Sequence, residues 1–293
     1  MPIAHVQGMK AGIGLRPLHL HELIRTQPTT AWLELHICNY LNHGVNRALL
    51  DKISAQSYNL SFHSVNMNLG GTVALDDDYF KKLKQACDSY QPLLVSDHLC
   101  FSATSVEHYH DLLPIPLNNH SLERLVNRMD DAQTRLQRPI LIENISQYFW
   151  HKNSSYSEAE FLNLLCQRSG CSLLLDLNNL YVNQQNGGPN CSEYLDQIEH
   201  RNVKEIHLGG HTQTEERLID SHAEDICDDV WSIYHKYCSV NPDPPCLIEW
   251  DSQLPELNYL IELAQKADQI KHDANAAVDT LNTSPELTSK HTV

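Results

Sequence analysis

The stretch PILIENISQYFWHKNSSYSEAEFLNLLCQRSGCSLLLDL (139–177) decides the fold. It contains two short, continuous apolar runs, ILI at 140–142 and LLL at 173–175. Such runs are typical of strands that are buried on both faces, as in a parallel sheet. Between them, 157–168 has the length and mixed polarity of a helix, and Ser157-x-x-Glu160 provides a capping box at its start. The stretch therefore predicts a strand–helix–strand unit.

The same alternation recurs along the chain. Strands are predicted at 11–16, 31–36, 58–63, 92–98, 139–144, 172–177, 203–208 and 245–250, and helices lie between them, for example at 76–90, 119–137 and 223–239. Asp76-Asp77-Asp78 places negative charge at one helix start, which the helix dipole favours. Eight such repeats predict an α/β fold, a single (β/α)8 barrel of the TIM type. The alternative, an open doubly wound sheet, needs a glycine-rich phosphate turn, and Gly12-Ile13-Gly14 is too short for one.

The sequence predicts one domain over 1–269. The segment 270–293 is polar and rich in Ser, Thr, Asn and Lys, so it is predicted to be a disordered tail. The segment 183–190 (NQQNGGPN) is predicted to be a loop.

Composition restricts the classes of function. The formal net charge of −16 argues against nucleic acid and anionic membranes as partners. The nine cysteines are odd in number and include no C-x-x-C pair, which favours reduced thiols in the cytoplasm over a disulfide framework. The first ten residues lack the apolar core of a signal peptide, and no apolar run approaches the length of about 20 residues that a membrane span needs. We therefore expect a cytoplasmic protein without nucleic-acid or membrane partners.

Six of the apolar runs lead into a residue that can bind a metal. In chain order these residues are His63, His98, Glu143, Asp176, His207 and Glu249. In a barrel the carboxyl ends of all strands meet on one face, where active sites form. The six endings belong to consecutive predicted strands, the third to the eighth, so they predict a metal site around the C-terminal mouth of the barrel.

Three further residues extend this set. Asn178 follows Asp176 by two residues, and Asp220-x-His222 adds a carboxylate and an imidazole after the seventh strand. These candidate ligands are more than one tetrahedral metal site can use. We therefore expect two or three metals, with Glu143 or Glu249 as bridging carboxylates. A set of nitrogen and oxygen ligands favours iron, manganese or zinc.

Other residues near the strand ends have candidate supporting roles. Asp251 is interpreted as a general base or an anchor for a ligand, the alternative being a helix N-cap before Pro255. Arg16 would clamp a substrate carboxylate or neutralise the acidic mouth, and His211 would orient a ligand or be one itself. Glu34 and His36 would complete the rim or form a structural ion pair.

With these motifs in hand, the chain resembles domain-of-unknown-function family 692, also called uncharacterised protein family 0276, the MbnB-like multinuclear non-haem iron enzymes. The resemblance extends from about Gly12 to Ala267. Its motifs are GIGLR (12–16), NLSFHSV (59–65), VSDHL (95–99), DLLPIP (111–116), ILIENISQY (140–148), LLLDLNNLYVN (173–183), IHLGGH (206–211), IDSHAEDICDDVW (219–231) and IEWD (248–251).

The resemblance implies a barrel with two or three iron ions, mixed Fe(II)/Fe(III), and dioxygen as co-substrate. The implied reaction is oxidation of cysteine in a ribosomally synthesised precursor peptide, either to an oxazolone and thioamide pair or with carbon excision. It also implies a heterodimer with a partner protein that binds the leader of the peptide. Carried over by motif, the iron ligands would be His63, His98, Glu143, Asp176, Asn178, His207, Asp220, His222 and Glu249, with Asp251 as the proton-transfer residue.

The chain departs from the family pattern after the second strand. Many members have Glu-Asn-Tyr there, whereas this chain has Cys38-Asn39-Tyr40, so a contact to a ligand or to the substrate would differ. Two other interpretations stand beside the iron enzyme. One is a barrel hydrolase or sugar isomerase with two or three zinc or manganese ions, and the other is a non-catalytic, metal-dependent binding protein.

Overall fold

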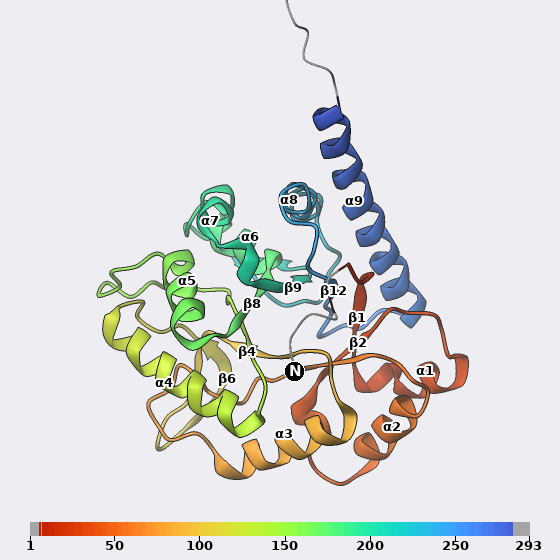
Figure 1. Ribbon diagram of the computed structural model, residues 1–293, viewed down its shortest axis with the longest axis horizontal. Helices are drawn as coiled ribbons and strands as arrows, with labels where there is room; N and C mark the ends of the chain where they lie inside the picture. The colour runs from red at the N-terminus through yellow and green to blue at the C-terminus, as the bar shows by residue number, and fades with distance from the viewer. Residues whose placement is uncertain (1–5, 7, 284–293) are drawn as a thin grey trace, which may run out of the picture.

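The computed structural model describes residue 6 and residues 8–283, with side chains up to 276, and its centre is a closed parallel barrel (Figure 1). The order around the barrel is β1-β12-β9-β8-β7-β4-β3-β2. The strands are β1 (Gly12–Leu15), β2 (Leu33–His36), β3 (Leu60–His63), β4 (Val95–His98), β7 (Leu141–Glu143), β8 (Ser172–Asp176), β9 (Val203–Leu208) and β12 (Cys246–Ile248). Each lies within one of the eight predicted segments, which confirms the (β/α)8 fold.

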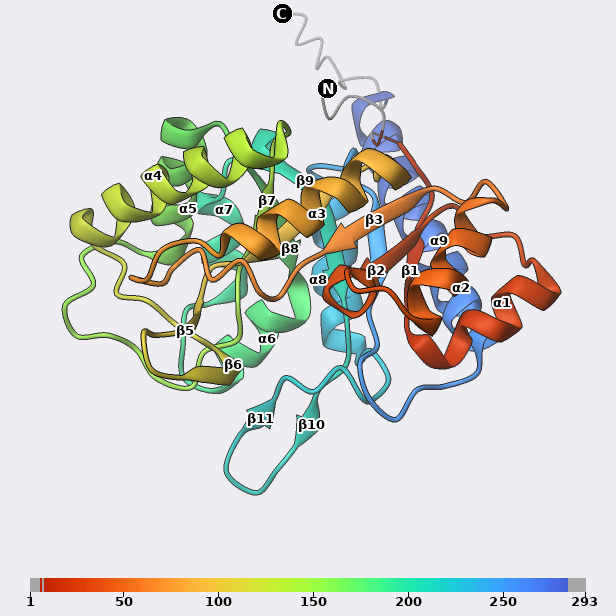
Figure 2. The ribbon, with the colours of Figure 1, turned by 90° about the horizontal axis from the view of Figure 1, so that it is seen from below.

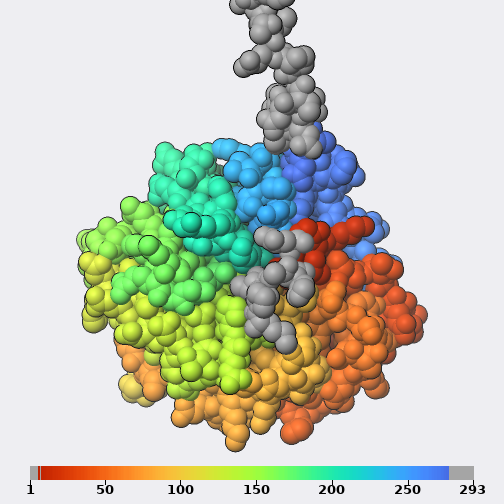
Figure 3. Space-filling view, viewed as in Figure 1, coloured from red at the N-terminus to blue at the C-terminus, as the bar shows by residue number. Residues whose placement is uncertain are grey.

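Helices surround the barrel, and Figure 3 shows successive segments of the chain following one another around the molecule. They are α1 (Leu20–Thr26), α2 (Val45–Ser54), α3 (Asp77–Tyr90), α4 (Asn119–Leu136), α5 (Glu158–Ser169), α6 (Leu177–Gln185), α7 (Cys191–Gln197), α8 (Asp228–Cys238) and α9 (Leu257–Thr283). Short 3-10 helices occupy Pro17–His19, Ile37–Tyr40 and His200–Asn202. The main apolar core fills the layer between helices and strands, as expected for a sheet whose outer face is covered.

Two antiparallel hairpins interrupt the alternation. One is formed by β5 (Phe101–Ala103) and β6 (His108–Leu113), and the other by β10 (Thr212–Gln213) and β11 (Leu218–Ile219). Figure 2 shows both hairpins extending from the same side of the barrel. β5 follows β4 and β10 follows β9 in the chain, so both hairpins belong to loops on the carboxyl-terminal face.

Three predicted boundaries were wrong. The loop predicted at 183–190 begins only after Gln185, because α6 continues to that residue, and α8 begins at Asp228 rather than at 223. The tail predicted from 270 is helical up to Thr283, while 284–293 lie outside the described residues. Apolar residues continue at helical spacing along α9, including Leu260, Ala267 and Ala274, and these three are fully buried, so packing extends the helix beyond the predicted boundary.

The interior of the barrel is arranged in layers, because alternate residues of a strand point to the same side. The register pairs His36 with His63, His98 with Glu143, and Asp176 with His207, which forms the top layer. One layer below, Glu34 pairs with Ser61, and Leu174 with Glu205. A small apolar cluster of Val6, Leu94, Leu141 and Leu174 fills the lower part.

Two further expectations can be compared with the structure. All nine cysteines are free, as predicted. Among the described residues, none of the helices combines the length and apolar character that crossing a membrane requires.

The start of α5 is capped as predicted and carries a buried charge. The Ser157 hydroxyl accepts from the Glu160 N–H, and the Glu160 carboxylate accepts from the Ser157 N–H, which completes the capping box. The first residue of the helix, Glu158, is buried, and its Oε1 accepts from Gln147 Nε2 at 2.9 Å. Burial raises the pKa of Glu158 to about 7, although hydrogen bonds oppose this shift.

Glu158→Gln should change the pH dependence of stability. A carboxyl whose pKa is raised by folding stabilises the native state below its unfolded pKa and loses this contribution as the pH rises through the folded pKa. The wild type should therefore lose up to about 3 kcal/mol between pH 4.5 and 7 from this group, and the variant should not. Urea unfolding from pH 4.5 to 8 measures the difference. Glu262→Gln, at an exposed position of α9, is the control, and parallel curves for wild type and Glu158→Gln would contradict the expectation.

Candidate metal centre

Glu143 connects two parts of the mouth. On one side, its Oε2 lies 3.4 Å from both His63 Nε2 and His98 Nε2, and these two nitrogens are 3.1 Å apart. On the other side, its Oε1 lies 3.8 Å from His207 Nδ1. Two imidazole nitrogens that face each other and one carboxylate oxygen form a group that a single metal ion would bring together. The geometry fits the predicted bridging role of Glu143.

A second group surrounds His207. Its Nδ1 lies 2.9 Å from Glu249 Oε2, and Glu143 and Asp176 also offer ligand atoms within 4.8 Å of one another in this group. All four side chains are buried. Since Glu143 belongs to both groups, two adjacent metal positions would share it.

His222 forms a third group at the loop after β9. Its Nε2 lies 2.8 Å from Asp220 Oδ1 and 3.7 Å from Asp176 Oδ2, while its Nδ1 lies 3.4 Å from Glu249 Oε2. His222 has a left-handed backbone conformation, with φ of 41°, and its ring lies over Gly209. A Cβ atom at Gly209 would lie 2.5 Å from the His222 Cδ2, so glycine is needed there for the close approach.

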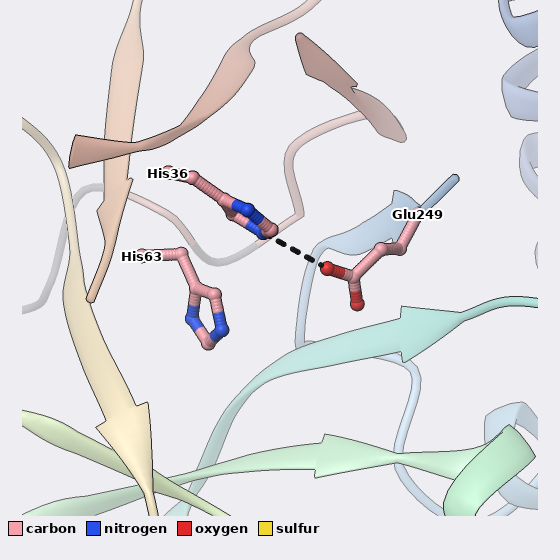
Figure 4. Close-up of side chains that lie close together, drawn as sticks. All are labelled: His36, His63 and Glu249. Atoms are coloured by element: carbon pink, nitrogen blue, oxygen red, sulfur yellow. Dashed lines mark hydrogen bonds and ion pairs between the residues drawn. The ribbon is translucent and has the colours of Figure 1, made fainter. Parts of the chain in front are cut away.

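Glu249 has two oxygens with different surroundings. Oε2 faces His207 and His222, whereas Oε1 lies 3.1 Å from Arg16 Nη2 and 3.3 Å from His36 Nε2. Figure 4 shows His36 and His63 facing Glu249 across the mouth, with the contact between His36 and Glu249 marked. Arg16 thus pairs with one carboxylate of the acidic mouth, and His36, at the end of β2, belongs to the rim.

Asp251 faces the same cluster. Arg16 Nε donates to its Oδ1 at 3.0 Å, and His222 Nδ1 lies 3.6 Å from its Oδ2. The alternative interpretation, a helix N-cap, is wrong, because α9 begins only at Leu257. The Asp251 side chain is 37% exposed, whereas that of Glu249 is 4% exposed, so Asp251 is the carboxylate of this pair that solvent or a substrate can reach.

Asn178 and His211 lie behind the third group. Asn178 Nδ2 donates to Asp220 Oδ1 at 2.8 Å, and its Oδ1 lies 2.9 Å from His211 Nδ1. In this orientation the amide holds Asp220 in place and directs its oxygen toward His211. His211 contacts Asn178, and whether it orients a ligand or is one itself stays a prediction.

Sequence reasoning missed three polar residues next to the candidate ligands. Ser96 Oγ lies 2.7 Å from His63 Nδ1, and the Asp97 carboxylate accepts from the His98 N–H at 2.6 Å. Glu205 is fully buried two residues before His207 on β9. The alternation of a strand could have revealed Glu205, because residues two apart point to the same side.

The electrostatics of the mouth indicate a missing positive charge. Burial raises the pKa of Glu143 well above its usual range, and burial raises that of Asp176 to about 7. Burial also acts to raise the pKa of Glu249, but His207 and His222 lower it well below normal, while burial and His98 lower the pKa of His63. Although burial opposes the shift, Glu143 raises the pKa of His98 to about 9, and the neighbouring carboxylates raise the pKa values of His207 and His222 well above normal. The carboxylates and imidazoles of the mouth thus tend to hold protons, which metal ions would displace to leave both in their ligand forms.

Several buried ligand atoms that form no hydrogen bond support the same conclusion. They are His98 Nδ1, Glu143 Oε2, Asp176 Oδ2, His207 Nε2 and His222 Nε2. Buried polar atoms normally have partners. Most of these atoms face another ligand atom of the cluster, so the residues present fit a centre with nitrogen and oxygen ligands for two or three metals.

A cavity of about 460 Å³ opens above the cluster. Its floor includes His63, His98, Glu143 and Glu249, and β6 supplies part of its wall through Tyr109, His110, Asp111 and Leu112. The cavity therefore joins the cluster to the outside beside the first hairpin.

Cys38, which departs from the family pattern, lies in a separate hydrogen-bonded chain. Its Sγ lies 3.3 Å from Tyr79 Oη, which lies 2.6 Å from Ser64 Oγ, and Ser64 donates to Asp97 Oδ2 at 2.8 Å. Asp97 in turn accepts from the His98 backbone. The thiol is thus connected to a candidate ligand through three intermediate groups rather than by contact.

Comparison with protein families finds one match across most of the chain. The model described as "RiPP precursor modification enzyme MbnB/TglH/ChrH" matches residues 10–272, where RiPP denotes a ribosomally synthesised and post-translationally modified peptide. A UPF0276 protein of Psychromonas ingrahamii is 43% identical over 91% of this chain and 95% of its own length. A UPF0276 protein of Acaryochloris marina is 38% identical over 90% of this chain and 94% of its own length.

Solved structures share the fold at low sequence identity. D-psicose 3-epimerase from Clostridium cellulolyticum has a TM-score of 0.54 at 9% identity, over 93% of this chain and 99% of its own. Endonuclease IV from Thermus thermophilus has a TM-score of 0.57 at 12% identity, over 89% of this chain and 99% of its own. At these identities the likeness concerns the barrel alone.

Gly209→Ala should reduce metal binding. The added methyl group would overlap the His222 ring and push this candidate ligand out of the third group. We expect the purified variant, incubated with ferrous iron under anaerobic conditions, to retain at least one ion fewer per chain than the wild type by elemental analysis.

Gly170→Ala is the matched control. Gly170 follows the last residue of α5 with φ of 68°, and nothing lies within 4 Å of where a Cβ atom would be, so alanine should cost about 1 kcal/mol of stability without affecting the mouth. Equal metal content in Gly209→Ala and the wild type would show that His222 is not a ligand.

Proposed function

Because the chain belongs to the RiPP precursor modification enzyme family MbnB/TglH/ChrH, we propose that it uses two or three non-haem iron ions and dioxygen to modify cysteine residues of a precursor peptide. The modification would be an oxidative rearrangement to an oxazolone and thioamide, or excision of a carbon. The observation that carries the proposal is the sharing of Glu143 and Glu249 between neighbouring imidazole groups, since bridging carboxylates are how proteins hold adjacent metals.

The three groups would divide the ions among them. His63, His98 and Glu143 would hold the first, Glu143, Asp176, His207 and Glu249 the second, and Glu249, His222 and Asp220 the third. Asn178 would complete the third once its amide oxygen turns from His211 toward the ion. Bound iron, mixed Fe(II)/Fe(III), would supply a position for the substrate thiolate and electrons for dioxygen. The protein would fix the spacing of the ions and keep water from the buried ligands.

The shape of the mouth supports a peptide as substrate. The cavity is open enough to admit a side chain, and Tyr109, His110 and Asp111 of β6 line it beside the ligands. A cysteine side chain would reach the ions while its backbone passed over the hairpin. A partner protein that binds the leader of the peptide, forming a heterodimer, would then hold the peptide in register.

Asp251 is proposed to be the residue that transfers a proton during the modification of the peptide. It is the exposed carboxylate beside His222, and Arg16 fixes its orientation. Arg16, Glu34 and His211 are proposed to support the centre without binding metal, through Glu249, His207 and Asn178 respectively.

The other interpretations gain no support from the comparisons. The sugar epimerase and the endonuclease have 9% and 12% sequence identity to this chain, so the likeness shows the barrel fold alone. A zinc or manganese hydrolase or isomerase would retain the ligands but would neither consume oxygen nor change a peptide cysteine.

The direct test is a reconstitution. The protein is loaded with ferrous iron under anaerobic conditions, and a short cysteine-containing peptide encoded beside its gene is added with the leader-binding partner and then with air. Mass spectrometry of the peptide and an oxygen electrode record the outcome. We expect a mass change located at cysteine together with oxygen uptake. Protein that retains only zinc and never consumes oxygen with the peptide would refute the proposal.

Asp251→Asn should separate catalysis from metal binding. Losing a general acid–base group lowers turnover by about 100-fold or more, whereas the amide retains the contact with Arg16 and leaves the ligands in place. Peptide turnover and iron content are measured together, with Asp88→Asn on the surface of α3 as the control. Unchanged turnover would remove Asp251 from the proposed mechanism.

A further inference from the structure

Two carboxylates lie inside the barrel, one layer below the candidate metal ligands. Glu34 of β2 and Glu205 of β9 are both 0% exposed, as is His207 above them. β2 and β9 are separated around the barrel by β1 and β12, so the two side chains meet across its interior. On β1, Gly14 pairs with Glu34, and the Arg16 guanidinium lies beside Gly14, where a Cβ atom would be 3.0 Å from Arg16 Nη1.

The two carboxylates converge on one nitrogen of His207. Nε2 lies 3.3 Å from Glu34 Oε1 and 3.7 Å from Glu205 Oε1. The other oxygen of Glu34 accepts from Ser61 Oγ at 3.4 Å, which directs Oε1 toward the imidazole. Glu34 Oε1, both oxygens of Glu205 and His207 Nε2 are buried, and within the described residues their contacts with one another are close approaches rather than hydrogen bonds, so all four atoms lack a hydrogen-bond partner.

The opposite nitrogen of His207 faces the mouth. Nδ1 lies 2.9 Å from Glu249 Oε2 and 3.8 Å from Glu143 Oε1. A neutral imidazole that binds a metal through one nitrogen carries its proton on the other, and an acceptor for that proton fixes the ring and its tautomer. The acceptors within reach of Nε2 are Glu34 and Glu205.

We propose that Glu34 and Glu205 are positioning residues that accept the Nε2–H of His207 and thereby direct its Nδ1 lone pair at the metals of the mouth. Glu34 is the principal acceptor because it is closer, and Glu205 supports it from the same strand as His207. The inference rests on the metal centre of the proposed function but not on its reaction. It assigns a role to Glu34 and Glu205, whose burial beneath the mouth would otherwise cost stability with no functional reason.

The test measures metal binding rather than peptide turnover. Wild type, Glu34→Gln, Glu34→Leu, Glu205→Gln and Glu205→Leu are titrated with cobalt(II), whose visible spectrum reports its ligands, against a competing chelator. Losing a group that orients a metal-binding histidine typically weakens metal affinity by about 10- to 100-fold. We expect this loss in Glu34→Leu, with a shifted cobalt spectrum, and a smaller loss in Glu205→Leu.

The glutamine variants should recover most of the affinity, since the amide oxygen still accepts from Nε2–H. At saturation, all variants should bind as many ions as the wild type, because the ligands remain. Glu158→Gln and Glu158→Leu, at a buried carboxylate outside the barrel, are the controls and should not change affinity or spectrum.

Three results would overturn the inference. If either glutamine variant binds one ion fewer at saturation, Glu34, Glu205 and His207 hold an ion of their own. If Glu34→Leu folds and binds cobalt with the affinity and spectrum of the wild type, the carboxylates do not orient His207. If the wild type binds no cobalt, there is no centre for them to support. Because cobalt binding needs neither peptide nor oxygen, the proposed reaction can fail while this inference holds.

Discussion

The contacts of the Glu249 carboxylate are the interaction on which the mouth depends. One oxygen lies between His207 and His222, and the other contacts Arg16 and His36. A buried carboxylate is tolerated only when such partners compensate for its lost hydration. β12 brings Glu249 beside β9 and β1, so one side chain links the second and third candidate metal groups to the positive charge of Arg16. Without it, only the 3.7 Å contact between Asp176 and His222 would join the second and third groups.

The remainder of the mouth shows why such a site needs a rigid barrel around it. Glu143, Asp176 and Glu249 would repel one another if all were ionised in a dry interior, and burial already raises the pKa of the first two. The apolar layer between strands and helices provides the stability that offsets this cost. The outer faces of the strands, packed against the helices, thus stabilise the fold, whereas the carboxylates at the mouth destabilise it. The loops and hairpins above the strands remain free to contact a substrate.

Much of this arrangement could be predicted from the sequence. The eight strands were found because each is a short apolar run, and the candidate ligands His63, His98, Glu143, Asp176, His207 and Glu249 were found because each ends such a run. The capping box at Ser157 is a local pattern and was also found. Glu205 was missed because it lies inside a run rather than at its end, and the continuation of α9 was missed because its buried face is marked by small residues such as Ala267 and Ala274.

The barrel, its polar rim and the family to which the chain belongs follow from the amino-acid sequence alone. These depend on the period of apolar residues and on short motifs, which are properties of neighbouring residues. The folded arrangement was needed to show which candidate ligands share a carboxylate, that Asp251 pairs with Arg16 instead of capping a helix, and that Glu34 meets Glu205 beneath His207. Those contacts join strands distant in the chain, and the closure and register of the barrel set them.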